Sequence, residues 1–101
     1  MHTWMLGAAL AVLSFQPALA GAPMAGEVLA QVWCSSCHDI SGDNTASDAA
    51  PTFYSVMNVE NRSAEFLSGW LINPHGAMPD PNLSRSEIDD IVAYMQTLRT
   101  E

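Results

Sequence analysis

The amino-acid sequence predicts a small all-α domain. Three segments carry apolar residues at helical spacing, and no segment shows the strict apolar–polar alternation of a half-buried strand. The last of the three begins with Ser84 and Glu87 in the S-x-x-E arrangement of a capping box, which marks the start of a helix. The chain has 101 residues, so we expect one domain built from three to four helices.

The first expected helix spans residues 24–36, "MAGEVLAQVWCSS". Val28 with Val32, and Leu29 with Trp33, form i, i+4 pairs that share one side of a helix. The pattern therefore predicts an amphipathic helix whose apolar side carries these four residues and which ends close to two cysteines.

Two short helices are expected in the middle of the chain. After a polar, turn-prone loop over residues 39–50, Pro51 opens "PTFYSVMN". This segment predicts one or two helical turns, because proline is tolerated at the first helical position. Ser63 is then the expected N-cap of a further helix that Pro74 ends.

The clearest helix follows Ser84 and extends to Arg99. Asp89 and Asp90 near its start and Arg99 near its end complement the helix dipole. Its apolar stripe consists of Ile88, Ile91, Val92, Met95 and Leu98.

Residues 1–20 predict a secretory signal peptide. The uncharged apolar run "WMLGAALAVLSF" is followed by Gln-Pro and then by "ALA", which has the small residues of an A-x-A cleavage site. A membrane-spanning helix needs about 20 apolar residues, and this run is shorter. We expect cleavage after Ala20, which leaves residues 21–101 as one domain without a membrane anchor.

The charge of the chain is strongly acidic. Eleven Asp and Glu residues face three Arg and no Lys, which gives a formal net charge of −8. Such a field disfavours binding to nucleic acid and to anionic membranes, and it favours partners that carry a basic patch.

A mature chain of this size buries a limited fraction of its surface, and its two cysteines could close only a very short disulfide loop. We therefore expect a metal or cofactor to complete the core.

Residues 34–38, "CSSCH", are the chemically informative motif. A thioredoxin-type dithiol would lie near a βαβ pattern, which the sequence lacks. A zinc site needs four ligands, and the sequence has no second C-x-x-C and no histidine pair at metal-binding spacing. C-x-x-C-H is the signature of c-type haem attachment. Two thiols about one helical turn apart can each add to one porphyrin vinyl group, and the imidazole of the next residue can reach the iron.

A second axial ligand of the iron would close such a site. Met78 follows in a loop rich in proline, and a thioether suits iron opposite an imidazole. His75 lies in the same loop, and its imidazole also binds iron well, so the residues themselves leave both candidates open. Met95 lies on an apolar helical stripe, where core packing is expected. Met57 and Met24 are weaker candidates.

Together these features resemble a small class I bacterial cytochrome c over residues 24–99. The segments that carry the resemblance are "VWCSSCH", "APTF", "FLSGWLINP", "HGAMP" and "EIDDIVAYMQTL". The resemblance implies an all-α fold around one covalently bound haem c, in which the C-terminal helix crosses the first.

The resemblance also implies a role for individual residues. Cys34 and Cys37 would form the thioethers, while His38 and Met78 would be the axial ligands of the iron. Pro51 would offer its carbonyl oxygen to the other ring nitrogen of His38, which fixes the tautomer of the ring.

Further positions concern packing around the haem. Trp70 would pack on the ring and donate its indole N–H to a propionate. Tyr94 and Gly26 would form the helix crossing, since glycine lets two backbones approach. Ala30 departs from the family, in which an aromatic residue precedes the first cysteine by four positions. The lysine ring of mitochondrial members is also absent.

The function implied is that of a one-electron carrier, exported to the periplasm and monomeric. Because both axial positions are filled, we expect no enzymatic activity. Its redox partner proteins are expected to carry a basic docking patch. Two alternatives remain open: a dedicated electron-accepting subunit of a periplasmic dehydrogenase, and a ligand-binding or peroxidatic haem protein in which Met78 is displaced.

Overall fold

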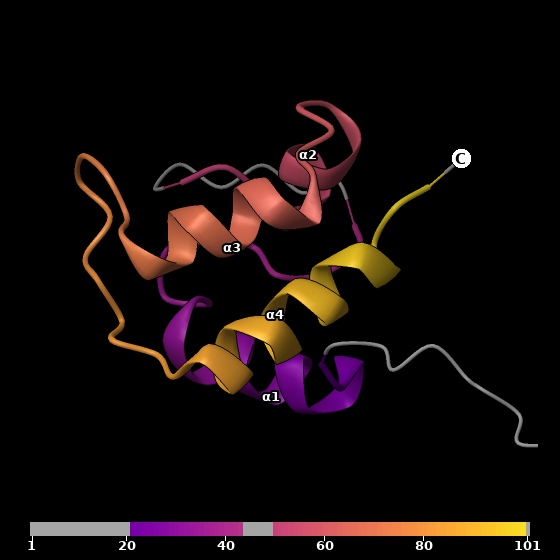
Figure 1. Ribbon diagram of the computed structural model, residues 1–101. Coiled ribbons are helices and arrows are strands. Elements are labelled where there is room, and N and C mark those ends of the chain that lie inside the picture. Colours follow the sequence, from indigo (N-terminus) through magenta and orange to yellow (C-terminus); the bar gives the residue numbers. More distant parts are fainter. Residues whose placement is uncertain (1–20, 44–49, 101) are drawn as a thin grey trace, which may run out of the picture.

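A computed structural model describes residues 21–43 and 50–100 of the chain (Figure 1). The helices of this part are α1 (Pro23–Trp33), α2 (Phe53–Asn58), α3 (Ala64–Ile72) and α4 (Arg85–Thr97). No strand occurs among the described residues, so the prediction of an all-α fold is confirmed. The predicted signal peptide, residues 1–20, lies outside the described residues.

Helix α4 is the central element of the fold. It packs most extensively against α1 and also contacts α3 and α2 (Figure 1). The predicted capping box is present, because Ser84 and Glu87 each accept a hydrogen bond from the backbone N–H of the other. The hydrogen bonds from Ser84 lower the pKa of the Glu87 carboxyl, which keeps this acidic side chain ionised at the positive end of the helix dipole.

The C-terminal end of α4 differs from the prediction. The helix ends at Thr97, so Arg99 lies beyond its last turn and does not complement its dipole. Its guanidinium donates instead to the carbonyl oxygen of Met57, 3.1 Å away, and to Oδ1 of Asn61, 2.6 Å away. It also donates to the carbonyl oxygen of Arg62. Arg99 therefore connects the end of the chain, through hydrogen bonds, to α2 and to the segment between α2 and α3.

The caps of the two short helices explain their bounds. The Ser63 side chain accepts from the N–H of Phe66 and caps α3 as predicted, and α3 ends two residues before Pro74. Helix α2 begins later than expected, because Thr52 is its N-cap and accepts from Ser55. Pro51 therefore precedes this helix and leaves its carbonyl oxygen available to another partner.

Helices α1 and α4 cross with their backbones in contact. A methyl group added to Gly26 would overlap the carbonyl oxygen of Asp90. The side chain of Asp90 accepts a 2.7 Å hydrogen bond from the N–H of Ala22, just before α1 begins. Tyr94, one turn along α4, is buried and donates its hydroxyl to the carbonyl oxygen of Ile40, 2.7 Å away. These contacts fix the position of α1 and of the segment after it on α4.

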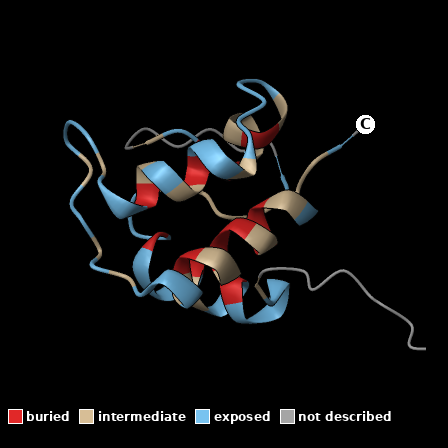
Figure 2. Cartoon of the chain, viewed as in Figure 1, coloured by how far each residue is buried: buried red, intermediate tan, exposed pale blue. Residues whose placement is uncertain are grey.

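The buried side of α1 is not the one that its large apolar residues predict. Gly26, Ala30 and Cys34 face the interior, whereas Val28 is 59% exposed and Val32 is 65% exposed. Small side chains line the contact because the two backbones are too close for larger ones. Leu29 is partly buried, but its expected partner Trp33 is more than half exposed. Figure 2 shows α1 with pale, exposed residues on its outer side.

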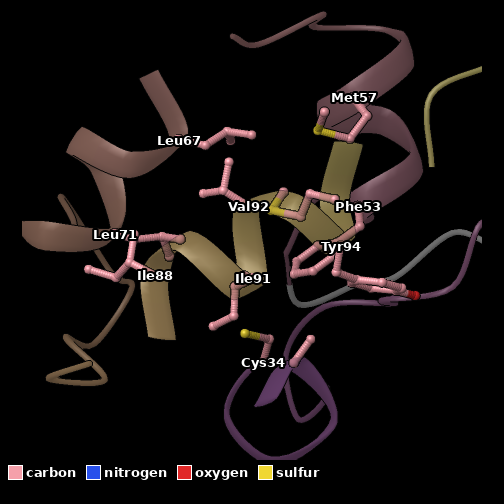
Figure 3. Close-up of a cluster of buried hydrophobic side chains, with 11 residues drawn as sticks. Cys34, Phe53, Met57, Leu67, Leu71, Ile88, Ile91, Val92 and Tyr94 are labelled. Atoms are coloured by element: carbon pink, nitrogen blue, oxygen red, sulfur yellow. The ribbon is translucent and has the colours of Figure 1, made fainter. Parts of the chain in front are cut away.

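The core lies between α4 and the other three helices. Figure 3 shows Ile91 of α4 between Cys34 of α1 and the leucines of α3. The cluster consists of Ala30, Cys34, Phe53, Met57, Leu67, Leu71, Ile88, Ile91, Val92, Tyr94 and Met95. Within the described residues, no helix is both long enough and apolar enough to cross a membrane.

We predict that Gly26→Ala lowers the free energy of unfolding by about 1–3 kcal/mol, because the added methyl group forces the two helix backbones apart. The control is Gly69→Ala in α3, where a methyl group meets nothing within 4 Å. That substitution is expected to raise the free energy of unfolding by up to about 1 kcal/mol, through helix propensity. Denaturant unfolding of the purified variants measures both values, and equal effects would contradict a close crossing at Gly26.

Candidate functional site

A cavity of about 410 Å³ opens beside the C-terminal end of α1, within the size range of small-molecule sites. Its walls come from α2, α3 and α4, from the segments just after α1 and just before α2, and from the loops that join α2 to α3 and α3 to α4. The lining residues are Cys34, Cys37, His38, Ala50, Pro51, Phe53, Val56, Glu60, Arg62, Phe66, Leu67, Trp70, Leu71, Ala77, Met78, Pro79, Ile91 and Met95. Most of these are apolar, so a cofactor placed here would be shielded from water.

The two cysteines lie one turn apart on the same side of the chain. Cys34 caps α1, and the N–H groups of Cys37 and His38 both donate to its carbonyl oxygen, at 3.2 Å and 2.9 Å. The side chain of Cys34 is buried and extends toward Ile91 (Figure 3), whereas Cys37 is exposed. Burial raises the pKa of the Cys34 thiol to about 11. Because a redox dithiol needs an accessible thiolate, this environment disfavours that chemistry.

His38 is oriented by a backbone carbonyl. Its Nδ1 lies 2.6 Å from the carbonyl oxygen of Pro51, which can only accept, so Nδ1 carries the proton. The ring also contacts Phe53, at a centroid distance of 5.5 Å. A hydrogen bond from the N–H of Phe53 to the carbonyl oxygen of Asp39 joins these two segments. In the neutral ring the second nitrogen, Nε2, is then the one that has a lone pair for a metal.

Met78 lines the same cavity from the loop after α3. Its side chain is partly buried against the core. Trp70 donates its indole N–H to the sulfur of Met78, with Nε1 and Sδ 3.2 Å apart. This is the N–H that the resemblance assigned to a propionate, and in the structure its partner is the methionine sulfur.

The other candidate axial ligands lie elsewhere. His75 is exposed and does not line the cavity, and its ring meets the edge of Trp70 at a centroid distance of 5.0 Å. Met24 is 83% exposed, and Met57 is buried in the core away from the cavity. Met95 lines the cavity but belongs to the buried stripe of α4, as expected.

Arg62 is a site residue that the sequence reasoning did not single out. It is the one basic side chain among the residues that line the cavity, where it lies 4.2 Å from the centre of the Phe66 ring and 3.4 Å from Glu60. The sequence feature that could have drawn attention to Arg62 is the scarcity of basic residues, because the whole chain has three arginines and no lysine.

The donor set fits a haem better than a bare metal ion. In the part of the chain that the structure describes, no cluster of three or more His, Cys, Asp or Glu side chains could hold a metal ion, which leaves a zinc site without its ligands. The cavity instead combines two thiols one turn apart, an imidazole of fixed tautomer, a thioether and apolar walls. Those are the groups that attachment and axial ligation of a haem require.

Comparisons with known proteins agree with this chemistry. Residues 21–95 match the family model described as cytochrome c oxidase, cbb3-type, subunit III. A cytochrome c-552 from Bradyrhizobium diazoefficiens is 40% identical over 103 residues, an alignment that covers 98% of this chain and 99% of that protein. No solved structure matches. The chain therefore belongs to the cytochrome c family, as a small monohaem class I member whose cofactor is covalently bound haem c with iron.

Proposed function

We propose that this cytochrome is a one-electron carrier whose iron has His38 and Met78 as axial ligands. The observation that carries the proposal is that both side chains line one apolar cavity, together with Cys34 and Cys37. Haem c bound there supplies a one-electron couple at its iron. The protein contributes the attachment points, the axial ligands and the exclusion of water.

Filled axial positions favour a carrier over an enzyme. With an imidazole and a thioether both supplied by the chain, no coordination position is left for a substrate. A methionine ligand raises the reduction potential of a haem. The indole N–H of Trp70 draws electron density from the Met78 sulfur, which favours the reduced state further. We propose that the protein has no catalytic activity of its own.

Each remaining site residue has a positioning role in this proposal. Cys34 and Cys37 form the thioethers, and the turn between them sets their separation. The carbonyl oxygen of Pro51 holds His38 at Nδ1 and so directs Nε2 to the iron. Trp70 holds the side chain of Met78 in the cavity. Its role toward a propionate, expected from the resemblance, stays a prediction.

We further propose that the protein works in the periplasm as a monomer. The family match begins at residue 21, directly after the predicted cleavage site, which supports residues 1–20 as a signal peptide and residues 21–101 as the mature domain. The net charge of −8 would attract redox partners that carry basic patches. The matching family model is described as an oxidase subunit, which makes an oxidase a reasonable electron acceptor.

We predict that Met78→Ala abolishes the sulfur-to-iron charge-transfer absorption band of the oxidised protein, because the thioether leaves the iron. His75→Ala is the matched control in the same loop and is expected to keep the band. Absorption spectra of the two purified variants decide between the ligands. Absence of the band from the unmodified protein, with a spectrum that changes in His75→Ala and not in Met78→Ala, would transfer the role to the histidine.

We predict that the native reduced protein does not bind carbon monoxide at neutral pH, whereas reduced Met78→Ala does. The reason is that the axial position opens only when the thioether is removed. Difference spectra after addition of carbon monoxide measure this. Binding by the native protein would favour a ligand-binding or peroxidatic role over that of a carrier.

We predict that haem stays with the polypeptide when the protein is denatured and extracted with acidified organic solvent, because both thioethers are covalent. The paired replacement Cys34→Ser with Cys37→Ser is expected to release all haem, or to accumulate without it. Haem that leaves the unmodified chain on extraction would contradict attachment at these two cysteines.

A further inference from the structure

The outer side of α1 is an apolar surface that the fold does not use. Three residues define this α1 face: Met24, Val28 and Val32. They are 83%, 59% and 65% exposed, respectively. They follow one another at intervals of four and lie one above the other on the helix. Exposed apolar side chains that lie next to one another indicate a contact surface for a partner, whereas singly scattered ones do not.

The α1 face ends close to the proposed haem attachment site. Val32 lies two residues before Cys34, which caps the helix and lines the cavity. Cys37 is exposed and also lines the cavity, so an attachment point lies at the molecular surface. A protein seated on the α1 face would therefore sit beside the place where the haem is joined to the chain.

Charge at the α1 face differs from that of the chain as a whole. Glu27 is the one ionisable residue within α1 itself, although the net charge of the chain is −8. Glu27 is exposed and directly precedes Val28 in the helix, so it gives the α1 face an acidic flank. A complementary partner is thus apolar where it meets the valines and basic where it meets this acidic flank.

The size of the α1 face argues for a transient contact. An 11-residue helix is about 16 Å long and 10–12 Å wide, so one face offers on the order of 200 Å². A stable dimer commonly buries about 800 Å² on each partner, whereas redox encounters lie at the low end of the range. The area fits brief docking better than a permanent second copy.

We infer that the α1 face is the contact surface for the electron-transfer partner, a redox protein with an apolar docking patch and a basic rim. The inference rests on the proposed carrier function and refines it. Net charge brings the partners together over long distances, while apolar contact at Val28 and Val32 holds them with the haem edge close by. The docked complex is therefore less sensitive to salt than the rate of encounter.

The test uses the haem-loaded protein and gold electrodes coated with a methyl-terminated alkanethiol layer, which imitate an apolar patch. We expect the paired variant Val28→Asn with Val32→Asn to lose about tenfold or more in affinity for this surface, because two exposed apolar side chains are lost. Valine and asparagine have similar helix propensities, so the helix is retained. The control pair is Val59→Asn with Ile72→Asn, at two exposed sites outside the cavity lining, and should change affinity less than about twofold.

Voltammetry on the same electrodes also reports the electron-transfer rate of adsorbed molecules. The inference is supported if electron transfer is fast in the unmodified protein and in the control variant but slow in the variant with both α1 valines replaced. Equal electron-transfer rates and affinities in the two paired variants would overturn it. A dimer in sedimentation that the α1 pair abolishes would also overturn it, in favour of a second copy. Absence of a reversible one-electron wave on any electrode would instead overturn the carrier function itself.

Discussion

Close contact between the backbones of α1 and α4 is the constraint on which the rest of the structure depends. Gly26 lets α1 lie directly on the carbonyl of Asp90, and the N–H of Ala22 is bound to the side chain of the same residue. With α1 held on α4 in this way, Cys34 at its C-terminal end reaches Ile91 (Figure 3). The helix crossing thus positions the proposed attachment site, and Ile91, which follows Asp90 at the crossing, also lines the cavity.

The cavity explains how so short a chain can hold a core. Several residues of the hydrophobic cluster, among them Leu71, Ile91 and Met95, also line the cavity. A large apolar cofactor placed against them would extend the core, which agrees with the expectation that a chain of this size needs more than its own side chains. The same apolar surroundings would keep water from an iron bound there, so the proposed site would serve stability and electron transfer together.

Local patterns predicted the parts of the fold that depend on neighbouring residues. The Ser84–Glu87 capping box and the Ser63 cap were found because their donors and acceptors lie within one turn of each other. The motif "CSSCH" similarly singled out three residues that all line the cavity, and the resemblance supplied the contact between His38 and Pro51 that the structure has.

Contacts between distant parts of the chain could not be predicted in this way. The side of α1 that is buried depends on Asp90, 64 positions from Gly26, so the large residues were assigned to the wrong side. Arg99 was matched to the dipole of its own helix, but its partners lie around the end of α2. The contact between the indole N–H of Trp70 and the sulfur of Met78 was not predicted either, because it depends on the path of the loop after α3. In each case tertiary geometry, and not the local pattern, determines the contact.

We propose that His38 and Met78 bind one iron from within the same cavity. Nuclear magnetic resonance of the reduced protein, with its methionine methyl groups labelled with carbon-13, tests this most directly, because the ring current of the haem shifts a methyl group most strongly when that group is held directly above the ring. We expect one strongly upfield-shifted methyl resonance that belongs to Met78, with smaller shifts for the methyl groups of Met57 and Met95. Methionine methyl resonances that all lie at ordinary positions would contradict it.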